Sequence, residues 1–158
     1  MLSPMIWMAL VALGTLAVAS IRRIPEGQVY TLRRVGGHTR VVPSGMHFMV
    51  PLIERVAHKI SLTGTRVPVD GLVAPDCRYR GIVYFQVLDP ARADRVIDGV
   101  DGLVQTRTRT LFGEADLPDG EDGRRQWLKQ ALNSDLRERG LIVTRVDLDS
   151  LHGVDTLH

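Results

Sequence analysis

The side chains that could carry out chemistry are few and scattered along this sequence. The five histidines lie at positions 38, 47, 58, 152 and 158, and no two have the i, i+4 spacing that places a pair of metal ligands on one helix face. Cys77 is the single cysteine, which excludes an internal disulfide and a Cys-x-x-Cys site. The sequence contains no nucleophile elbow, phosphate-binding loop or His-Glu-x-x-His motif. We therefore expect no catalytic residue, no metal and no cofactor.

The charged residues are confined to one part of the chain. No Asp, Glu, Lys or Arg precedes Arg22, and the remainder carries 20 Lys and Arg against 18 Asp and Glu. Mixed charge together with 44% hydrophobic residues excludes a disordered tail protein. Arginines at 78, 80, 107 and 109 could form a nucleic-acid patch, but a net charge of +2 and few aromatic residues argue against it. The sequence predicts an apolar leader followed by a charged globular domain.

The leader is apolar on every helical face. Residues 5–21 read MIWMALVALGTLAVASI, and a helix that starts at Met1 would extend about 31 Å, close to the ~30 Å hydrocarbon thickness. Trp7 lies near one end, where an indole favours the membrane interface. A buried core helix is the alternative, but a soluble domain would leave one face polar. We expect a single-pass transmembrane anchor over residues 1–23.

The residues that flank the leader indicate its fate and orientation. Ala17-Val18-Ala19 satisfies the rule for signal-peptide cleavage, but the leader lacks the cationic start that such peptides have. Instead Arg22 and Arg23 follow the apolar run. The positive-inside rule then places the domain in the cytoplasm.

Strand patterns come first in the domain and helical patterns follow. Strand character occurs at residues 28–34, 39–42, 53–62, 66–69, 82–87 and 141–148. Helices are expected from Pro90, over 101–111 and over 124–139 with Asp122 as cap, although period-two alternation at 105–110 leaves a strand open there. In the strongest strand, Val83, Phe85 and Val87 should face the core. This order predicts an α+β fold with an antiparallel sheet and packed helices.

Several segments together resemble a known family. They are Pro25-Glu26-Gly27-Gln28-Val29, then residues 43–51 (PSGMHFMVP), residues 81–93 (GIVYFQVLDPARA) and residues 139–148 (RGLIVTRVDL). Their order and spacing resemble the band 7 family of stomatins, prohibitins and flotillins, also called SPFH proteins. The resemblance extends over about residues 6–150. It implies domain limits of 1–23 for the anchor, 24–150 for the SPFH domain and 151–158 for a short tail.

The resemblance implies a non-catalytic, membrane-anchored scaffold that organises lipids or a membrane-protein partner such as a membrane protease complex. In SPFH proteins the hairpin that corresponds to residues 46–53 dips into the bilayer, whereas a buried core strand is the other reading of these residues. The expected membrane contacts are therefore Trp7, Arg22, Arg23, Met46, Phe48 and Met49. The rival functions are a membrane-tethered hydrolase and a basic nucleic-acid-binding module. The expected location is the bacterial inner membrane.

Assembly is the last expectation. Family members continue into a coiled-coil helix that drives ring formation, whereas this sequence stops at His158 and offers only the helix over 124–139. That helix carries Arg124, Arg125, Lys129, Arg137 and Arg139 against Asp135 and Glu138, so copies of it should repel one another. We expect weak homo-oligomers and a requirement for a partner, such as another SPFH subunit.

Overall fold

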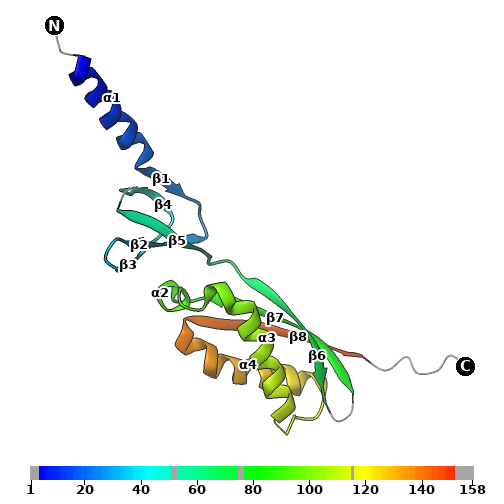
Figure 1. Ribbon diagram of the computed structural model, residues 1–158. Helices are drawn as coiled ribbons and strands as arrows, with labels where there is room; N and C mark the ends of the chain where they lie inside the picture. Colours follow the sequence, from blue (N-terminus) through cyan, green and yellow to red (C-terminus); the bar gives the residue numbers. More distant parts are fainter. Residues whose placement is uncertain (1–3, 51–52, 75–76, 115, 152–158) are drawn as a thin grey trace, which may run out of the picture. The chain divides into compact units, whose positions relative to one another are not determined.

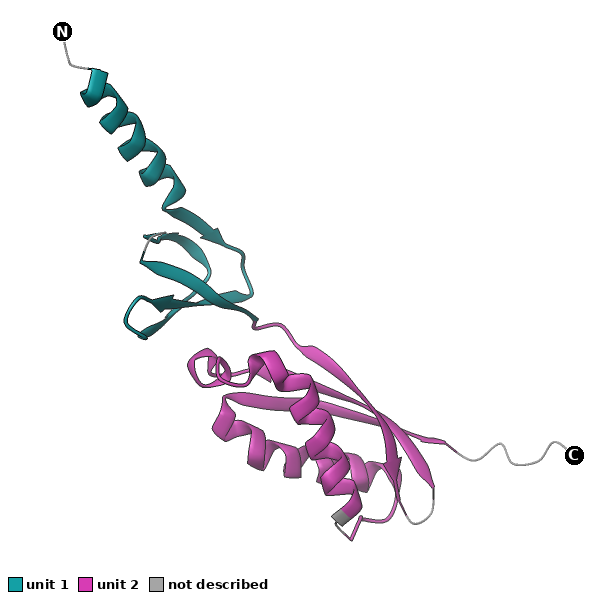
Figure 2. Cartoon of the chain, in the orientation of Figure 1, with its two compact units in different colours: residues 1–60 teal, residues 61–158 magenta. Residues whose placement is uncertain are grey.

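The computed structural model describes residues 4–50, 53–74, 77–114 and 116–151, which belong to two compact units (Figures 1 and 2). Unit 1 comprises residues 1–60 and unit 2 comprises residues 61–158. Both contain antiparallel strand pairs, and unit 2 adds packed helices. The expected α+β class with antiparallel sheets is confirmed. The expected limits at residues 23 and 150 stay predictions.

Unit 1 consists of one helix and a set of short strands. These are α1 (Pro4–Ala19), β1 (Ile21–Ile24), β2 (Gln28–Arg34), β3 (Thr39–Val42), β4 (Gly45–Phe48) and β5 (Glu54–Ser61). Strand β1 pairs with β4, and β2 lies between β3 and β5. Ile24, Leu32, Val42 and Met49 form a small buried core, and Tyr30 packs against it.

The predicted transmembrane span over residues 5–21 is not supported. Among the residues that the structure describes, no helix is both long enough and apolar enough to cross a membrane. Helix α1 ends at Ala19 because the chain turns at Ser20 and continues as strand β1 from Ile21. Its 16 residues extend about 24 Å, less than the ~30 Å of a bilayer's hydrocarbon layer.

Unit 2 is a sheet with helices packed on it. Its elements are β6 (Thr65–Val73), β7 (Arg78–Val87), α2 (Pro90–Ala93), the 3-10 turn η1 (Ile97–Gly99), α3 (Val100–Glu114), α4 (Glu121–Leu136), the 3-10 turn η2 (Arg137–Arg139) and β8 (Leu141–Leu151). The strands run antiparallel in the order β6-β7-β8. Helix α3 packs against β6 and helix α4 against β8 (Figure 1).

The period-two prediction for β7 is confirmed. Val83, Phe85 and Val87 are buried, whereas Tyr84 is half-buried and Gln86 is exposed. Because successive side chains of a strand point to opposite faces, one face of the sheet lies against the core. Helix α4 contributes Leu128, Leu132 and Leu136 to that core, at the i, i+4, i+8 spacing of a single helix face.

The structure decides the open prediction for residues 105–110 and corrects the predicted cap of α4. The alternating segment 105–110 is helical and belongs to α3, where the Thr108 and Thr110 hydroxyls donate to the carbonyl oxygens of Val104 and Thr106 at 2.7 and 3.0 Å. Asp122 is not the cap of α4, since the helix already begins at Glu121 and Gly120 occupies the cap position.

Candidate membrane-contact site

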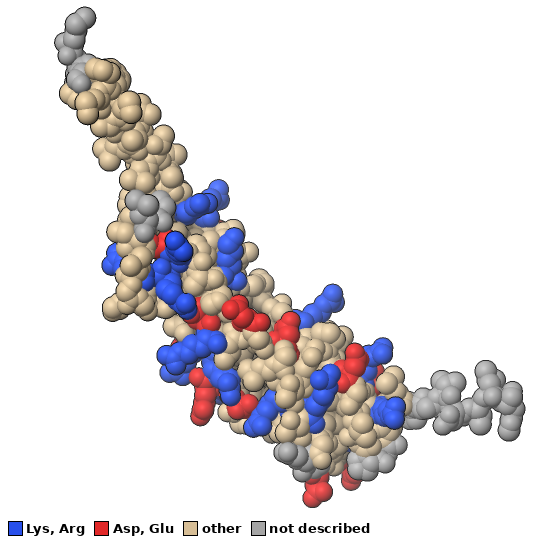
Figure 3. All heavy atoms as spheres, viewed as in Figure 1, with Lys and Arg blue, Asp and Glu red and all other residues tan. Residues whose placement is uncertain are grey.

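Helix α1 presents an apolar surface on all sides. None of its described residues is buried, and it contains no charged side chain. Thr15, one of its few polar residues, donates its hydroxyl to the carbonyl oxygens of Val11 and Ala12 at 3.0 and 2.9 Å, so this polar group is satisfied within the helix. Trp7 is 61% exposed. Figure 3 shows α1 free of charged atoms, with Lys and Arg gathered beside its C-terminal end.

A buried serine joins α1 to the strands of unit 1. The Ser20 hydroxyl donates to the Leu16 carbonyl oxygen at 2.7 Å and so caps the last turn of the helix. The Ser20 carbonyl oxygen accepts a hydrogen bond from the Met49 backbone N–H at 2.8 Å. These two bonds fix the end of α1 next to the end of β4.

The β1–β4 pair carries most of the other expected contact residues. Ile21 lies opposite Phe48, and Arg23 lies opposite Met46. Since alternate residues share a face, these four side chains lie on one face of the pair. Met46 is 73% exposed and Phe48 is 65% exposed. The pair therefore offers an exposed surface of apolar side chains with one arginine, directly after α1.

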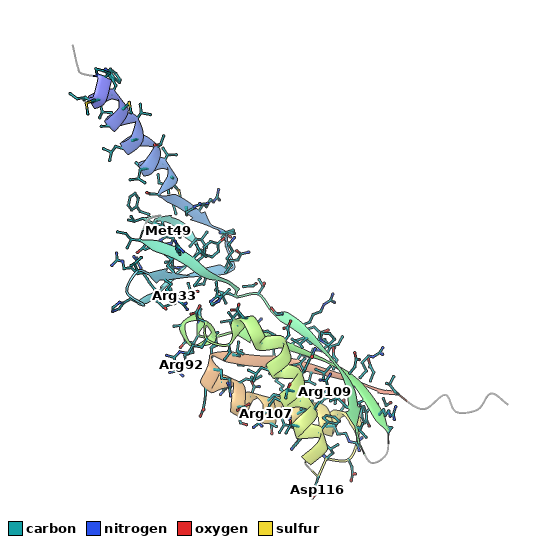
Figure 4. The ribbon with its side chains drawn as sticks, viewed as in Figure 1. Arg33, Met49, Arg92, Arg107, Arg109 and Asp116 are labelled. Atoms are coloured by element: carbon teal, nitrogen blue, oxygen red, sulfur yellow. The ribbon has the colours of Figure 1, made fainter. Side chains whose placement is uncertain are left out.

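Met49 was expected at the membrane, and the structure places it elsewhere. Its side chain is only 6% exposed and packs with Ile24, Leu32 and Val42 in the core of unit 1 (Figure 4). The alternation of β4 continues through Met49, so its side chain lies on the face opposite Met46 and Phe48, which stay exposed. Residues 51 and 52 of the same apolar run lie outside the described residues.

Two further cations of this region escaped the sequence prediction. Arg22 and Arg23 share a hollow at the end of α1 with Arg55 and Lys59 of β5. Arg55 and Lys59 are four residues apart in a strand, which places them on one face. This even spacing is the feature of the sequence from which a shared cationic face could have been predicted. The pairing of distant strands was needed to show that this face meets the end of α1.

The cationic face predicted for α4 is smaller than expected. Arg124 is buried, donates to the Tyr79 hydroxyl oxygen and to the Pro118 carbonyl oxygen, and stacks over the Tyr79 ring. Arg125 pairs with Glu121 and Asp122, and Asp135 pairs with Arg107. Lys129 and Arg137 of the predicted cationic face line a groove of about 760 Å³ beside β8.

Arg145 of β8 also lines that groove. Its guanidinium donates to the Asp147 carboxylate at 2.6 Å, and this bond together with the negative charge of Asp147 raises the pKa of Arg145 above its ordinary value. Arg145 therefore stays charged at any physiological pH.

Within the described part of the chain, no group of three or more His, Cys, Asp or Glu side chains could hold a metal ion.

Comparison with known proteins relates the chain distantly to stomatin-like proteins. It is 26% identical over 106 residues to stomatin-like protein stl-1 of Caenorhabditis elegans, an alignment that covers 61% of this chain and 33% of that protein. It is 24% identical over 103 residues to human mitochondrial stomatin-like protein 2, covering 60% of this chain and 29% of that protein.

An uncharacterized protein of Mycobacterium tuberculosis is similar over more of the chain. It is 30% identical over 155 residues, which cover 90% of this chain and 41% of that protein. The chain thus spans less than half the length of each of these relatives. No model of a known protein family matches the chain.

Proposed function

We propose that this chain is a non-catalytic scaffold of the SPFH type that attaches to a membrane through α1. The observation that carries the proposal is the surface of α1, which is apolar, uncharged and exposed on every face. The distant similarity to stomatin-like proteins supports the SPFH assignment and the scaffold role. The scaffold would organise lipids or a membrane-protein partner, such as a membrane protease complex or another SPFH subunit.

Burial energetics favour insertion of α1. Each large apolar side chain that leaves water gains about 1.5–3 kcal/mol. The exposed ones on α1 are Met5, Ile6, Trp7, Met8, Leu10, Val11, Leu13, Leu16 and Val18. The helix already satisfies its own backbone hydrogen bonds, so insertion leaves few polar groups without partners. The burial of these nine side chains together therefore favours insertion of α1.

The arginines that follow α1 give the proposed attachment its direction. Arg22 and Arg23 are exposed and stand where the chain leaves the helix. Cations at this position favour the headgroup region and the cytoplasmic side. We place the globular part on the cytoplasmic side of a bacterial inner membrane, with Met46 and Phe48 of the β1–β4 pair facing the lipid surface.

Flotation of the full chain with neutral phosphatidylcholine vesicles tests the proposal. We expect the wild-type chain to float with the vesicles. The double variant Leu10→Lys/Leu13→Lys should remain at the bottom of the gradient, because each lysine at the middle of an inserted helix costs about 2.5–3.5 kcal/mol. Val35→Lys/Val73→Lys is the matched control, since it adds the same charge at exposed apolar positions outside α1. A wild-type chain that does not float would refute membrane attachment through α1.

A further inference from the structure

A hollow of about 460 Å³ lies within unit 1 at the end of α1. Its lining includes Tyr30 and Ala19, the last residue of α1. Four cations complete it, namely Arg22, Arg23, Arg55 and Lys59. The first two follow α1 in the chain and the other two belong to β5. The fold thus gathers positive charge from two separate segments at the point where the apolar helix ends.

These cations are not neutralised by the protein. Among the described residues, no acidic side chain forms an ion pair with any of the four. Glu54 also lines the hollow, but its side chain is 8% exposed, and its carboxylate lies 3.6 Å from the guanidinium of Arg34, a residue outside the hollow lining. Lys59 instead lies over the Tyr30 ring, 5.5 Å from its centre.

Gathered cations repel one another unless an anion lies among them. Guanidinium groups bind phosphate oxygens through paired N–H donors, and a lysine adds a compact positive charge. The Tyr30 hydroxyl can donate one more hydrogen bond to such an oxygen. The chemistry of the hollow therefore suits a phosphate group that carries negative charge.

We propose that this hollow binds the phosphate of an anionic lipid headgroup. The proposal rests on the attachment of α1 to a membrane, because that attachment brings lipid headgroups to the end of the helix. A lipid is the favoured source because the hollow adjoins Ala19, where acyl chains beside α1 would end and headgroups begin. The bound lipid would then select membranes, or regions of a membrane, that are rich in anionic phospholipid.

The test measures vesicle binding of the full chain with and without phosphatidylglycerol in phosphatidylcholine vesicles. For each variant the readout is the ratio of the two affinities at fixed ionic strength. We expect the wild-type chain to bind the anionic vesicles at least about tenfold more tightly, and Arg55→Gln/Lys59→Gln to lose most of that ratio. Arg33→Gln/Arg40→Gln removes the same charge from exposed positions of β2 and β3 outside the hollow, and should keep the ratio within about twofold.

The outcomes separate this inference from the proposed function. An equal loss of the affinity ratio in both double variants would overturn the proposal that the hollow binds a headgroup, because general attraction between charges would then explain the binding. Failure of the wild-type chain to bind neutral vesicles would instead contradict attachment through α1. A third arm adds inorganic phosphate at matched ionic strength. Displacement of the wild-type chain from anionic vesicles by that ion would show a site for free phosphate and overturn the lipid assignment, whereas unchanged binding supports it.

Discussion

The Phe85 ring lies in the core of unit 2 and is 2% exposed. It shares the inward face of β7 with Val83 and Val87. We expect Phe85→Ala to lower the free energy of unfolding of unit 2 by about 3–5 kcal/mol, because it removes buried apolar contacts and leaves a cavity. Urea unfolding followed by circular dichroism measures this loss. Leu88→Ala, at an exposed position of the same segment, is the control and should change it by less than about 0.5 kcal/mol.

A loss below about 1 kcal/mol for Phe85→Ala would show that the ring does not support the core.

The inward face of β7 could be predicted from the sequence, because alternation over a long strand is a strong signal. The burial of Arg124 could not be predicted in the same way. Arg124 lies at the start of a polar helix and is buried only because Tyr79 of β7 offers its ring and hydroxyl. Met49 was expected at the membrane, but period-two alternation places it on the face opposite Met46 and Phe48, where it packs in the core of unit 1.

Among the elements, the turn between η2 and β8 depends on one glycine. Gly140 has a φ of 78°, in the left-handed region, and its carbonyl oxygen accepts hydrogen bonds from the backbone N–H groups of Leu88 and Asp89. A Cβ at this position would overlap the Asp89 carbonyl oxygen. We expect Gly140→Ala to destabilise unit 2 by at least about 2 kcal/mol, from backbone strain and this overlap.

The control is Gly102→Ala in α3, where a Cβ meets open space and the backbone is helical. It should stabilise unit 2 by up to about 1 kcal/mol, because alanine favours a helix over glycine. Thermal unfolding of both variants gives the comparison. Equal melting temperatures for the two would contradict the close packing of Gly140 against the segment before α2.

Most strands and helices could be predicted from the sequence, and the exceptions have physical reasons. Strand β1 was missed because Ile21–Ile24 carries two arginines and precedes a proline, so only its pairing with the distant β4 makes it a strand. The same pairing ends α1 early and shortens the predicted span. For α3 the sequence left helix and strand open, because the threonines alternate. The structure is helical there, with Val100, Val104 and Thr108 buried at the i, i+4 spacing of one helix face.

For the molecule as a whole, side chains from the helices bond some of the backbone groups at the outer edges of the unit 2 sheet. On β6, the Pro68 and Asp70 carbonyl oxygens accept hydrogen bonds from Gln105 and Arg109 of α3. On β8, the Asn133 side chain bonds both the N–H and the carbonyl oxygen of Val143, at 2.8 and 3.0 Å. Open edges are the usual route to edge-to-edge association between sheets. At these positions the bonds remove backbone groups that a second sheet could pair with, which favours weak self-association.

We therefore predict monomers or small oligomers for the purified full chain in mild detergent, measured by sedimentation equilibrium. Asn133→Ala should increase association, because it exposes the backbone groups of Val143 at the edge of β8. Gln130→Ala, an exposed position on the same helix, is the control and should leave association unchanged. A large closed ring from the wild-type chain alone would contradict this prediction and the need for a partner.

Attachment of α1 to lipid is the central claim, and Trp7 reports on it directly. The chain has two tryptophans, so Trp127→Phe leaves the indole of Trp7 as the single tryptophan signal. In the full chain with vesicles that carry brominated acyl chains, we expect the emission of Trp7 to shift to the blue and to be quenched. The same protein with Leu10→Lys/Leu13→Lys added should show neither change. An emission spectrum of Trp7 that vesicles leave unshifted and unquenched would contradict the account.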